Sequence, residues 1–280
     1  MGNELPTLQS WINLGALRGQ QVAHPAKNRW INLSRVCKSA ALPTVSAGAT
    51  GALVIIPVPQ VLKPAQVRQL RAHLDQADWI DGSLTAGAQA RTVKHNQQLA
   101  PDSRLAQQLG ELILTALAGH AVFISAALPL KIFPPQFNRY QAGETYGLHV
   151  DNAIRIVPGS STRVRTDLSA TLFLSEPQEY EGGELLIEDN FGSHSVKLSA
   201  GDLILYPATS LHKVTPVTAG ARVSSFFWLQ SMVRDNERRA MLFDLDQSVQ
   251  SLTALHGHEQ KDVVRLSWLY HNLIRQWADT

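Results

Sequence analysis

The chain has 280 residues, of which 44% are hydrophobic and 17% charged, and its formal net charge is +2. This apolar content is enough for a folded core, which excludes general disorder, and the length suits one large domain or two small ones. A single cysteine, Cys37, excludes an intramolecular disulfide and a CxxC metal or redox motif. No apolar run approaches the ~18 residues that a membrane helix needs, and the N-terminus lacks the pattern of a secretory signal. We therefore expect a cytoplasmic protein with no membrane partner.

The charge is distributed unevenly along the chain. Residues 1–50 contain five basic side chains and one acidic side chain, whereas residues 51–280 contain 20 basic and 22 acidic ones. The first segment shows no sustained helical or strand period, so we interpret residues 1–51 as a poorly ordered basic extension. Because the remainder is slightly acidic and has no basic stripe, no nucleic acid is expected as a partner.

Residues 52–130 predict a helical N-terminal part that packs on the core. A short apolar strand from Ala52 leads to a helix that begins at Pro64, a residue suited to the first helical turn. Three apolar residues follow at helical spacing: Val67, Leu70 and Leu74. A second helix is predicted over residues 103–117.

The segment 131–231 has a different character. Short stretches rich in β-branched and aromatic residues alternate with Gly, Pro and Asp. The predicted strands are 171–174, 184–188, 195–198, 202–206 and 222–229. Gly182 and Gly183 predict a tight turn between two of them. Many short strands at this spacing are typical of a sandwich or barrel.

A helical pattern returns over residues 232–280 and ends in an amphipathic stretch at 263–277. The order of elements therefore predicts an α+β protein with a β core between N-terminal and C-terminal helices. The apolar terminal helix could pack against a second copy as readily as against the core, so a homo-oligomer is one expectation.

A set of potential metal ligands lies in the β part. His149 and Asp151 are separated by one residue, so on an extended segment their side chains point to the same face. With the distant His212, they make the two imidazoles and one carboxylate of the facial triad typical of non-haem Fe(II) sites. Arg222, at the start of a predicted strand, offers a planar fork of donors to a carboxylate. Each signal alone is weak, but the joint pattern favours a metal site.

The stretches around these residues resemble the PKHD-type hydroxylases, which are Fe(II)/2-oxoglutarate dioxygenases of the prolyl 4-hydroxylase type. The resembling stretches are 137–155, 181–189, 201–207 and 225–235, and the likeness extends over about residues 52–280. One departure is Lys94-His95-Asn96, where the family pattern has Asn in the middle, so no role is assigned to His95.

The resemblance implies a double-stranded β-helix (jelly-roll) core within 131–231. It also implies that His149, Asp151 and His212 bind Fe(II), and that Arg222 binds a carboxylate of the cosubstrate 2-oxoglutarate. L-Ascorbate would restore Fe(II). The implied reaction uses O₂ to hydroxylate a small-molecule or peptidyl substrate and releases succinate and CO₂, with a loose link to iron acquisition.

Other residues near these motifs have two readings each. Tyr140 could hydrogen-bond 2-oxoglutarate or be a half-buried core residue. Asn152 and Arg155 could line the substrate mouth or belong to a solvated loop. A loop at 158–161 could form a lid or be ordinary surface, together with the polar residues that follow it, Arg163, Arg165 and Asp167. Three tryptophans are expected to be packing residues: Trp228, Trp268 and Trp277.

Two other functions compete with a hydroxylase. A non-catalytic metal or 2-oxoglutarate sensor would keep the pocket without turnover, but such a protein could lose Arg222 freely. A nucleic-acid demethylase of the same superfamily conflicts with the negative charge of residues 51–280.

Overall fold

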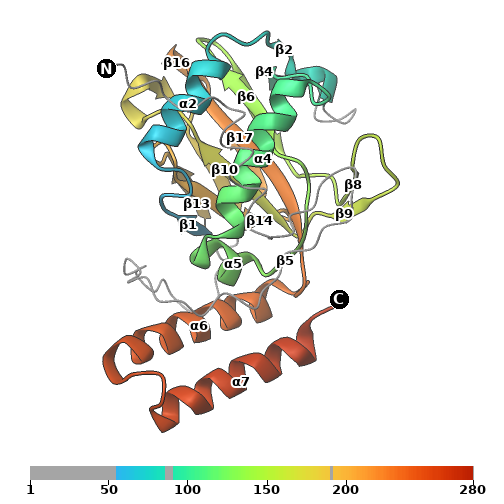
Figure 1. The fold of residues 1–280 in the computed structure, drawn as a ribbon. Coiled ribbons are helices and arrows are strands. Elements are labelled where there is room, and N and C mark those ends of the chain that lie inside the picture. The colour runs from blue at the N-terminus through green and yellow to red at the C-terminus, as the bar shows by residue number, and fades with distance from the viewer. Residues whose placement is uncertain (1–54, 86–90, 190–191, 280) are drawn as a thin grey trace.

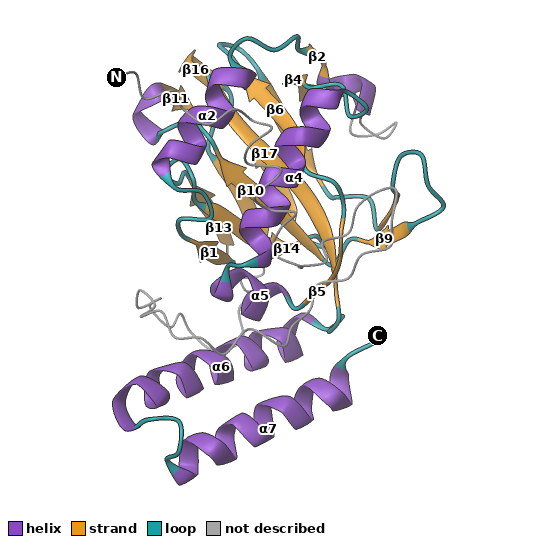
Figure 2. Ribbon diagram, viewed as in Figure 1, coloured by secondary structure: helices purple, strands orange, loops and turns teal. Residues whose placement is uncertain are grey.

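The computed structural model describes residues 55–85, 91–189 and 192–279, so the predicted basic extension at 1–51 lies outside the described residues. Two antiparallel sheets form the core, and helices cover one outer face (Figure 1). Figure 2 shows the strands of the larger sheet behind these helices.

The larger sheet has the strand order β1-β14-β10-β17-β6-β4-β2, and β5 pairs with β17 at one side. Its strands are β1 (Ile56–Val58), β2 (Ile80–Asp81), β4 (Gln97–Gln98), β5 (Pro129–Ile132), β6 (Gln136–Tyr140), β10 (Leu168–Phe173), β14 (Leu203–Pro207) and β17 (Arg222–Ser231).

The smaller sheet has the order β13-β12-β15-β7-β3. Its strands are β3 (Lys94–His95), β7 (Thr145–His149), β12 (Leu185–Asp189), β13 (Gly192–Val196) and β15 (Leu211–Val214). The chain passes back and forth between the two sheets, from β6 to β7 and again from β14 to β15 to β17. This alternation makes the predicted jelly roll, and the predicted strands are confirmed to within a few residues at their ends.

Two small pairs of strands complete the β structure. One joins β8 (Ile154–Ile156) to β9 (Arg163–Arg165), and the other joins β11 (Tyr180–Gly182) to β16 (Val217–Gly220). Gly182 has φ +68°, and a Cβ there would lie 2.1 Å from the carbonyl oxygen of Pro216. β11 and β12 follow one another along β16 and β15, so the chain does not reverse at this point. The predicted tight turn is therefore wrong: Gly182 lies at an irregularity in the ladder, and only glycine fits there without strain.

Alternation along the strands divides the core into two layers. On β14, Leu203 and Leu205 pack on the helix side, whereas Ile204 and Tyr206 belong to the cluster between the sheets. The layer between the sheets also contains Tyr140 and Phe173. Side chains from both sheets therefore meet in this interior, where the site described below lies.

Three helices cover the outer face of the larger sheet: α2 (Pro64–Leu74), α4 (Arg104–Ala118) and α5 (Ala121–Ala127) (Figure 1). The three apolar residues predicted on α2 are all buried. Ser103 begins α4 as an N-cap, because its side chain accepts a hydrogen bond of 3.2 Å from the backbone N–H of Ala106. Both predicted helices are confirmed.

The segment 52–130 contains more than the predicted strand and helices. Three two-residue strands, β2, β3 and β4, pair with the sheets, and the helix α5 was not predicted. Strands of two residues show no period, and all seven residues of α5 are apolar or small, so it has no polar face to reveal it.

The C-terminal segment forms an antiparallel pair of helices, α6 (Asn236–His256) and α7 (Lys261–Trp277), at one end of the core (Figure 1). Leu128, Met232, Val233 and Leu242 form a buried cluster that joins the pair to the core, and Trp277 packs against it. Trp268, expected to be a packing residue, is instead 64% exposed.

Among the described helices, none alone is long and apolar enough to cross a membrane. The pair α4 and α5 reaches that length and composition together, but the two helices meet at a bend of 88°.

Candidate metal and cosubstrate site

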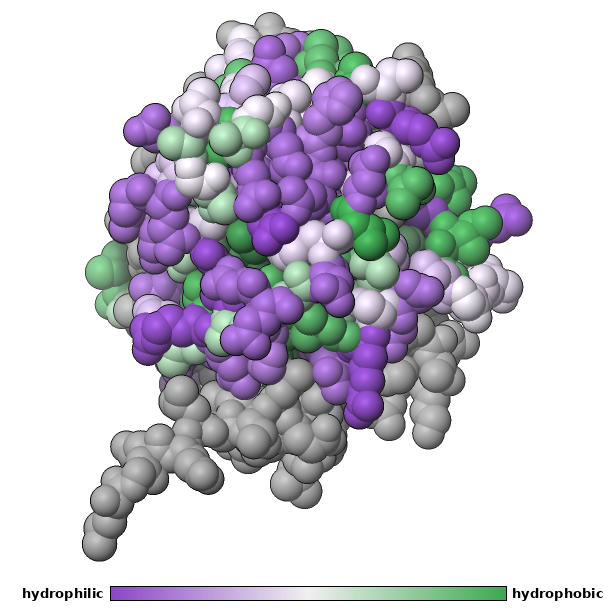
Figure 3. All heavy atoms as spheres, turned by 90° about the horizontal axis from the view of Figure 1, so that it is seen from above, coloured by the Kyte–Doolittle hydropathy of each residue, from purple (hydrophilic) through white to green (hydrophobic). Residues whose placement is uncertain are grey.

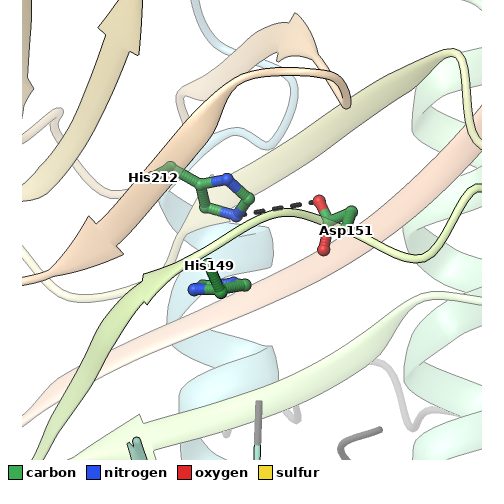
Figure 4. Close-up of side chains that lie close together, drawn as sticks. All are labelled: His149, Asp151 and His212. Atoms are coloured by element: carbon green, nitrogen blue, oxygen red, sulfur yellow. Dashed lines mark ion pairs between the residues drawn. The ribbon is translucent and has the colours of Figure 1, made fainter. Parts of the chain in front are cut away.

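The three predicted metal ligands lie together in the structure. His149 ends β7, and β15 places His212 opposite it in the sheet register. Asp151 follows two residues later. One potential ligand atom from each of the three side chains lies within 4.8 Å of the others, and Figure 4 shows the three side chains around a common point. The structure therefore has the close grouping that the HxD spacing predicts.

Backbone carbonyls orient both imidazoles. Nδ1 of His149 lies 2.8 Å from the carbonyl oxygen of Gly147, and Nδ1 of His212 lies 3.1 Å from that of Ser210. Because a carbonyl can only accept, Nδ1 carries the proton in each ring and Nε2 keeps its lone pair for a metal. Hydrogen bonding of the second ring nitrogen is the usual arrangement of metal-bound histidines.

Asp151 is held by a side chain rather than by the backbone. The hydroxyl of Ser169, on β10, donates a hydrogen bond of 2.6 Å to Oδ2 of Asp151. The same Oδ2 lies 3.7 Å from Nε2 of His212. Nitrogen and oxygen donors in this number suit a divalent first-row metal, and a two-histidine, one-carboxylate set is typical of Fe(II). The donor set therefore fits the implied ion.

The surroundings keep His149 uncharged. Burial and the adjacent His212 lower the pKa of His149 to about 4. Tyr146 stacks on the His149 ring with 3.6 Å between ring centroids and 15° between planes. At neutral pH the imidazole is thus in the neutral form that binds metals.

Arg222 begins β17 and is 1% exposed. Its Nη1 donates a hydrogen bond of 2.8 Å to the Ser224 hydroxyl, and the rings of Tyr140 and Phe173 flank the guanidinium at 5.4 and 5.2 Å. Its Nε is buried and has no hydrogen-bond partner among the described residues. A buried unpaired donor is costly, and a carboxylate bound in the cavity would satisfy it. This arrangement fits a carboxylate cosubstrate.

Tyr140 lies opposite Arg222 in the register of β6 and β17. It is fully buried rather than half-buried, and it lines the same cavity. Burial raises the pKa of Tyr140 to about 12, although the Arg222 charge opposes that shift. The phenol therefore keeps its proton and can act as a donor.

A cavity between the sheets connects these groups. Of the residues with two readings, Asn152 and Arg155 line it, whereas Arg163, Arg165 and Asp167 are not part of its described lining. Arg165 instead pairs with Asp167, with 2.7 Å between Nε and Oδ1. Arg163 and Arg165 belong to β9, and Asp167 directly precedes β10.

Several lining residues were not singled out from the sequence. Trp228, expected to be a packing residue, packs in the interior and also lines the cavity. The residues that were not singled out are Lys94, Tyr146, Ser169, Tyr206 and Phe226. They come from separate strands of both sheets, so no local spacing marks them. A lysine in a two-residue strand gives no sequence signal of burial.

The fold and this site define a 2-oxoglutarate- and Fe(II)-dependent oxygenase. Residues 135–230 match the family model described as the 2OG-Fe(II) oxygenase superfamily, and residues 236–279 match that of the PKHD-type hydroxylase C-terminal domain. A PKHD-type hydroxylase of Saccharophagus degradans is 58% identical over 227 residues, which is 81% of this chain and 100% of the relative. One from Burkholderia cenocepacia is 58% identical over 226 residues, with the same coverage. The chain belongs to the PKHD-type hydroxylases, which makes it an oxidoreductase of the dioxygenase class and confirms the resemblance.

Solved structures give more distant likenesses. A Pseudomonas putida prolyl-4-hydroxylase is 22% identical with a TM-score of 0.44, and the match covers 64% of this chain and 93% of that one. HygX of Streptomyces hygroscopicus, solved with nickel, 2-oxoglutarate and hygromycin B, is 16% identical with a TM-score of 0.43, covering 62% and 82%. At these scores neither likeness identifies a substrate.

Proposed function

We propose that this chain hydroxylates a small-molecule or peptidyl substrate with O₂ and 2-oxoglutarate, releasing succinate and CO₂. One observation carries the proposal: His149, Asp151 and His212 bring their ligand atoms together at a cavity that Arg222 also lines, and the buried Nε of Arg222 has no hydrogen-bond partner within the described chain. A metal-binding triad and a buried cation for a carboxylate thus share one enclosed space.

Each side chain has a defined part in this proposal. Nε2 of His149, Nε2 of His212 and a carboxylate oxygen of Asp151 would hold Fe(II), which when bound supplies the redox chemistry that activates O₂. Arg222 would bind the far carboxylate of 2-oxoglutarate, and the Tyr140 hydroxyl would donate a hydrogen bond to it. Both are buried, so these contacts form away from water and are stronger for it.

Succinate release tests this function. Purified protein is incubated with Fe(II), 2-oxoglutarate and O₂, with and without a metabolite extract, and succinate is measured by mass spectrometry. We expect enzyme-dependent succinate and, in the extract, a product heavier by one oxygen atom. Asp151→Ala should abolish both and lose stoichiometric iron while keeping the wild-type circular dichroism spectrum, because the jelly roll has its own core.

Two outcomes would contradict the proposal. One is a wild-type protein that releases no succinate with any extract, and the other is an Asp151→Ala variant that retains full iron and activity. Omitting ascorbate from the same assay tests whether it serves as the reductant that restores Fe(II). Protein levels in iron-starved and iron-replete cells test the suggested link to iron acquisition.

A further inference from the structure

The charges that line the cavity are unbalanced. Three cationic side chains line it, Lys94, Arg155 and Arg222, and among the described lining residues Asp151 is the single acid. With Fe(II) and 2-oxoglutarate bound as proposed, the charges of Asp151, Arg222, the ion and the dianion cancel. Lys94 and Arg155 are then two further cationic side chains of this lining.

In the wall of the cavity, Lys94 is buried and Arg155 is half-buried. Lys94 is 5% exposed, and the Nε of Arg155 is buried without a hydrogen-bond partner among the residues that the structure describes. Arg155 resembles Arg222 in this respect, since each guanidinium has a buried Nε with no hydrogen-bond partner in the described part of the chain. Asp81 also acts on Lys94, but it is exposed and lies outside the cavity lining.

Aromatic rings hold both cations near the metal ligands. The Arg155 guanidinium lies 3.4 Å from the centroid of the Trp228 ring, and Lys94 Nζ lies 5.8 Å from that of Phe226. Phe226 and Trp228 are neighbours, with 5.5 Å between their centroids, so the two cations are on adjoining parts of one wall. Lys94 Nζ is also 5.4 Å from the ring of Tyr146, which stacks on His149.

We propose that Lys94 and Arg155 form a second anion-binding subsite, which takes a carboxylate or similar oxyanion of the substrate. The inference rests on the function proposed above, because it assigns Arg222 to 2-oxoglutarate and leaves the second pair for the substrate. The apolar rings of Phe226 and Trp228 would contact the neighbouring part of the substrate. The substrate class is therefore an organic anion with an apolar portion, either a small acid or a peptide with an acidic side chain.

Pairs of probes with the same shape and different charge test this anion-binding subsite. Protein loaded with Ni²⁺ and saturated with 2-oxoglutarate, so that Arg222 is occupied, is titrated calorimetrically with pairs that differ in charge alone. The pairs are benzoate and benzamide, hexanoate and hexanamide, and a blocked tripeptide with central Glu or Gln. We expect the anion to bind about tenfold tighter or more in at least one pair, as suits a charge-assisted hydrogen bond. The pair that responds distinguishes a small acid from a peptide.

Substitutions identify the residues that cause the preference for the anion over the amide. Lys94→Gln and Arg155→Gln should each reduce it about tenfold, and Arg155→Lys should restore part of it. Arg163→Gln removes an equal charge from an exposed position on β9 and should leave it unchanged. The affinity for 2-oxoglutarate should stay within about twofold in all four variants, and near-ultraviolet circular dichroism checks their folds.

The proposal is overturned if the wild type binds the anion and the neutral amide of every pair with the same affinity, or binds neither of them. It is also overturned if the preference survives in the Lys94→Gln, Arg155→Gln double variant, or if Arg163→Gln removes it as well. Failure of the proposed function has a different signature, because the wild type would then bind no 2-oxoglutarate before any probe is added.

Discussion

The two histidines of the site are oriented by the same local device. Each Nδ1–H donates to the carbonyl of the residue two positions earlier, Gly147 for His149 and Ser210 for His212. Their ring orientation thus follows from strand geometry and needs no other side chain. Asp151 differs, since its orientation depends on the hydroxyl of Ser169.

Ser169→Ala should therefore weaken metal binding without removing a ligand. Loss of such a supporting hydrogen bond typically costs 10–100-fold in metal affinity, and we expect a decrease in that range here. Competition with a chelator measures it. Ser210→Ala is the matched control: it removes a buried hydroxyl that has no partner among the described residues and keeps the carbonyl that orients His212. Equal affinities for both variants and the wild type would refute the role of Ser169.

Arg222→Gln should separate cosubstrate binding from metal binding. Leaving a buried carboxylate without its cation costs roughly 100-fold in affinity for 2-oxoglutarate, whereas iron binding should change about twofold or less. Equilibrium binding of each, measured on the same preparation, gives the comparison. A parallel loss of both affinities would instead indicate misfolding around β17.

At the scale of the element, α4 shows how the outer layer is stabilised. Leu109, Ile113 and Leu117 are 0% exposed and face the larger sheet. Their spacing of four residues puts them on one side of the helix. This face, rather than helical propensity, attaches α4 to the core.

Leu109→Ala should lower the free energy of unfolding by about 2–5 kcal/mol, the usual cost of emptying a fully buried leucine site. Chemical denaturation of the apo-protein measures the change. Gln107→Ala, on the exposed side of the same helix, should cost about 0.5 kcal/mol or less. A small effect of Leu109→Ala would show that the layer collapses to fill the space.

The elements differ in how far the sequence predicts them. α2 and α4 are long enough to show a helical period, and β10, β12, β14 and β17 carry runs of β-branched and aromatic residues. The grouping of His149, Asp151 and His212 was predictable because the HxD spacing already puts two metal ligands on one face of a strand. A three-ligand site then needs one more histidine from elsewhere in the chain. The places of Lys94 and Ser169 were not predictable, since they depend on β3 pairing with β7 and on which face of β10 meets Asp151.

At the scale of the whole molecule, the neutral His149 makes stability depend on pH. Its pKa of about 4 in the folded protein lies below the ordinary value of 6.5, so between these values the unfolded chain binds more protons than the folded one. Acidification from pH 6.5 towards 4 therefore destabilises the metal-free protein. This single group contributes up to about 1.4 kcal/mol per pH unit.

Denaturation of metal-free protein across this pH range measures the effect. His149→Asn should show a shallower decline, because the substituted amide does not titrate. Identical slopes for the variant and the wild type would mean that His149 takes up no proton on unfolding in this range.

The strand β17 fixes the spacing between Arg222 and the aromatic residues that line the other part of the cavity. Arg222 stands at its start, and Phe226 and Trp228 face the cavity further along, about 13 and 20 Å away at the rise of an extended strand. Hydrogen bonds to β10 on one side and β6 on the other prevent β17 from sliding. The strand therefore fixes the distance between Arg222, the proposed cosubstrate anchor, and Phe226 and Trp228, the proposed substrate contacts. In this proposal, side-chain size at positions 226 and 228 would limit which substrates fit, while their spacing from Arg222 stays constant.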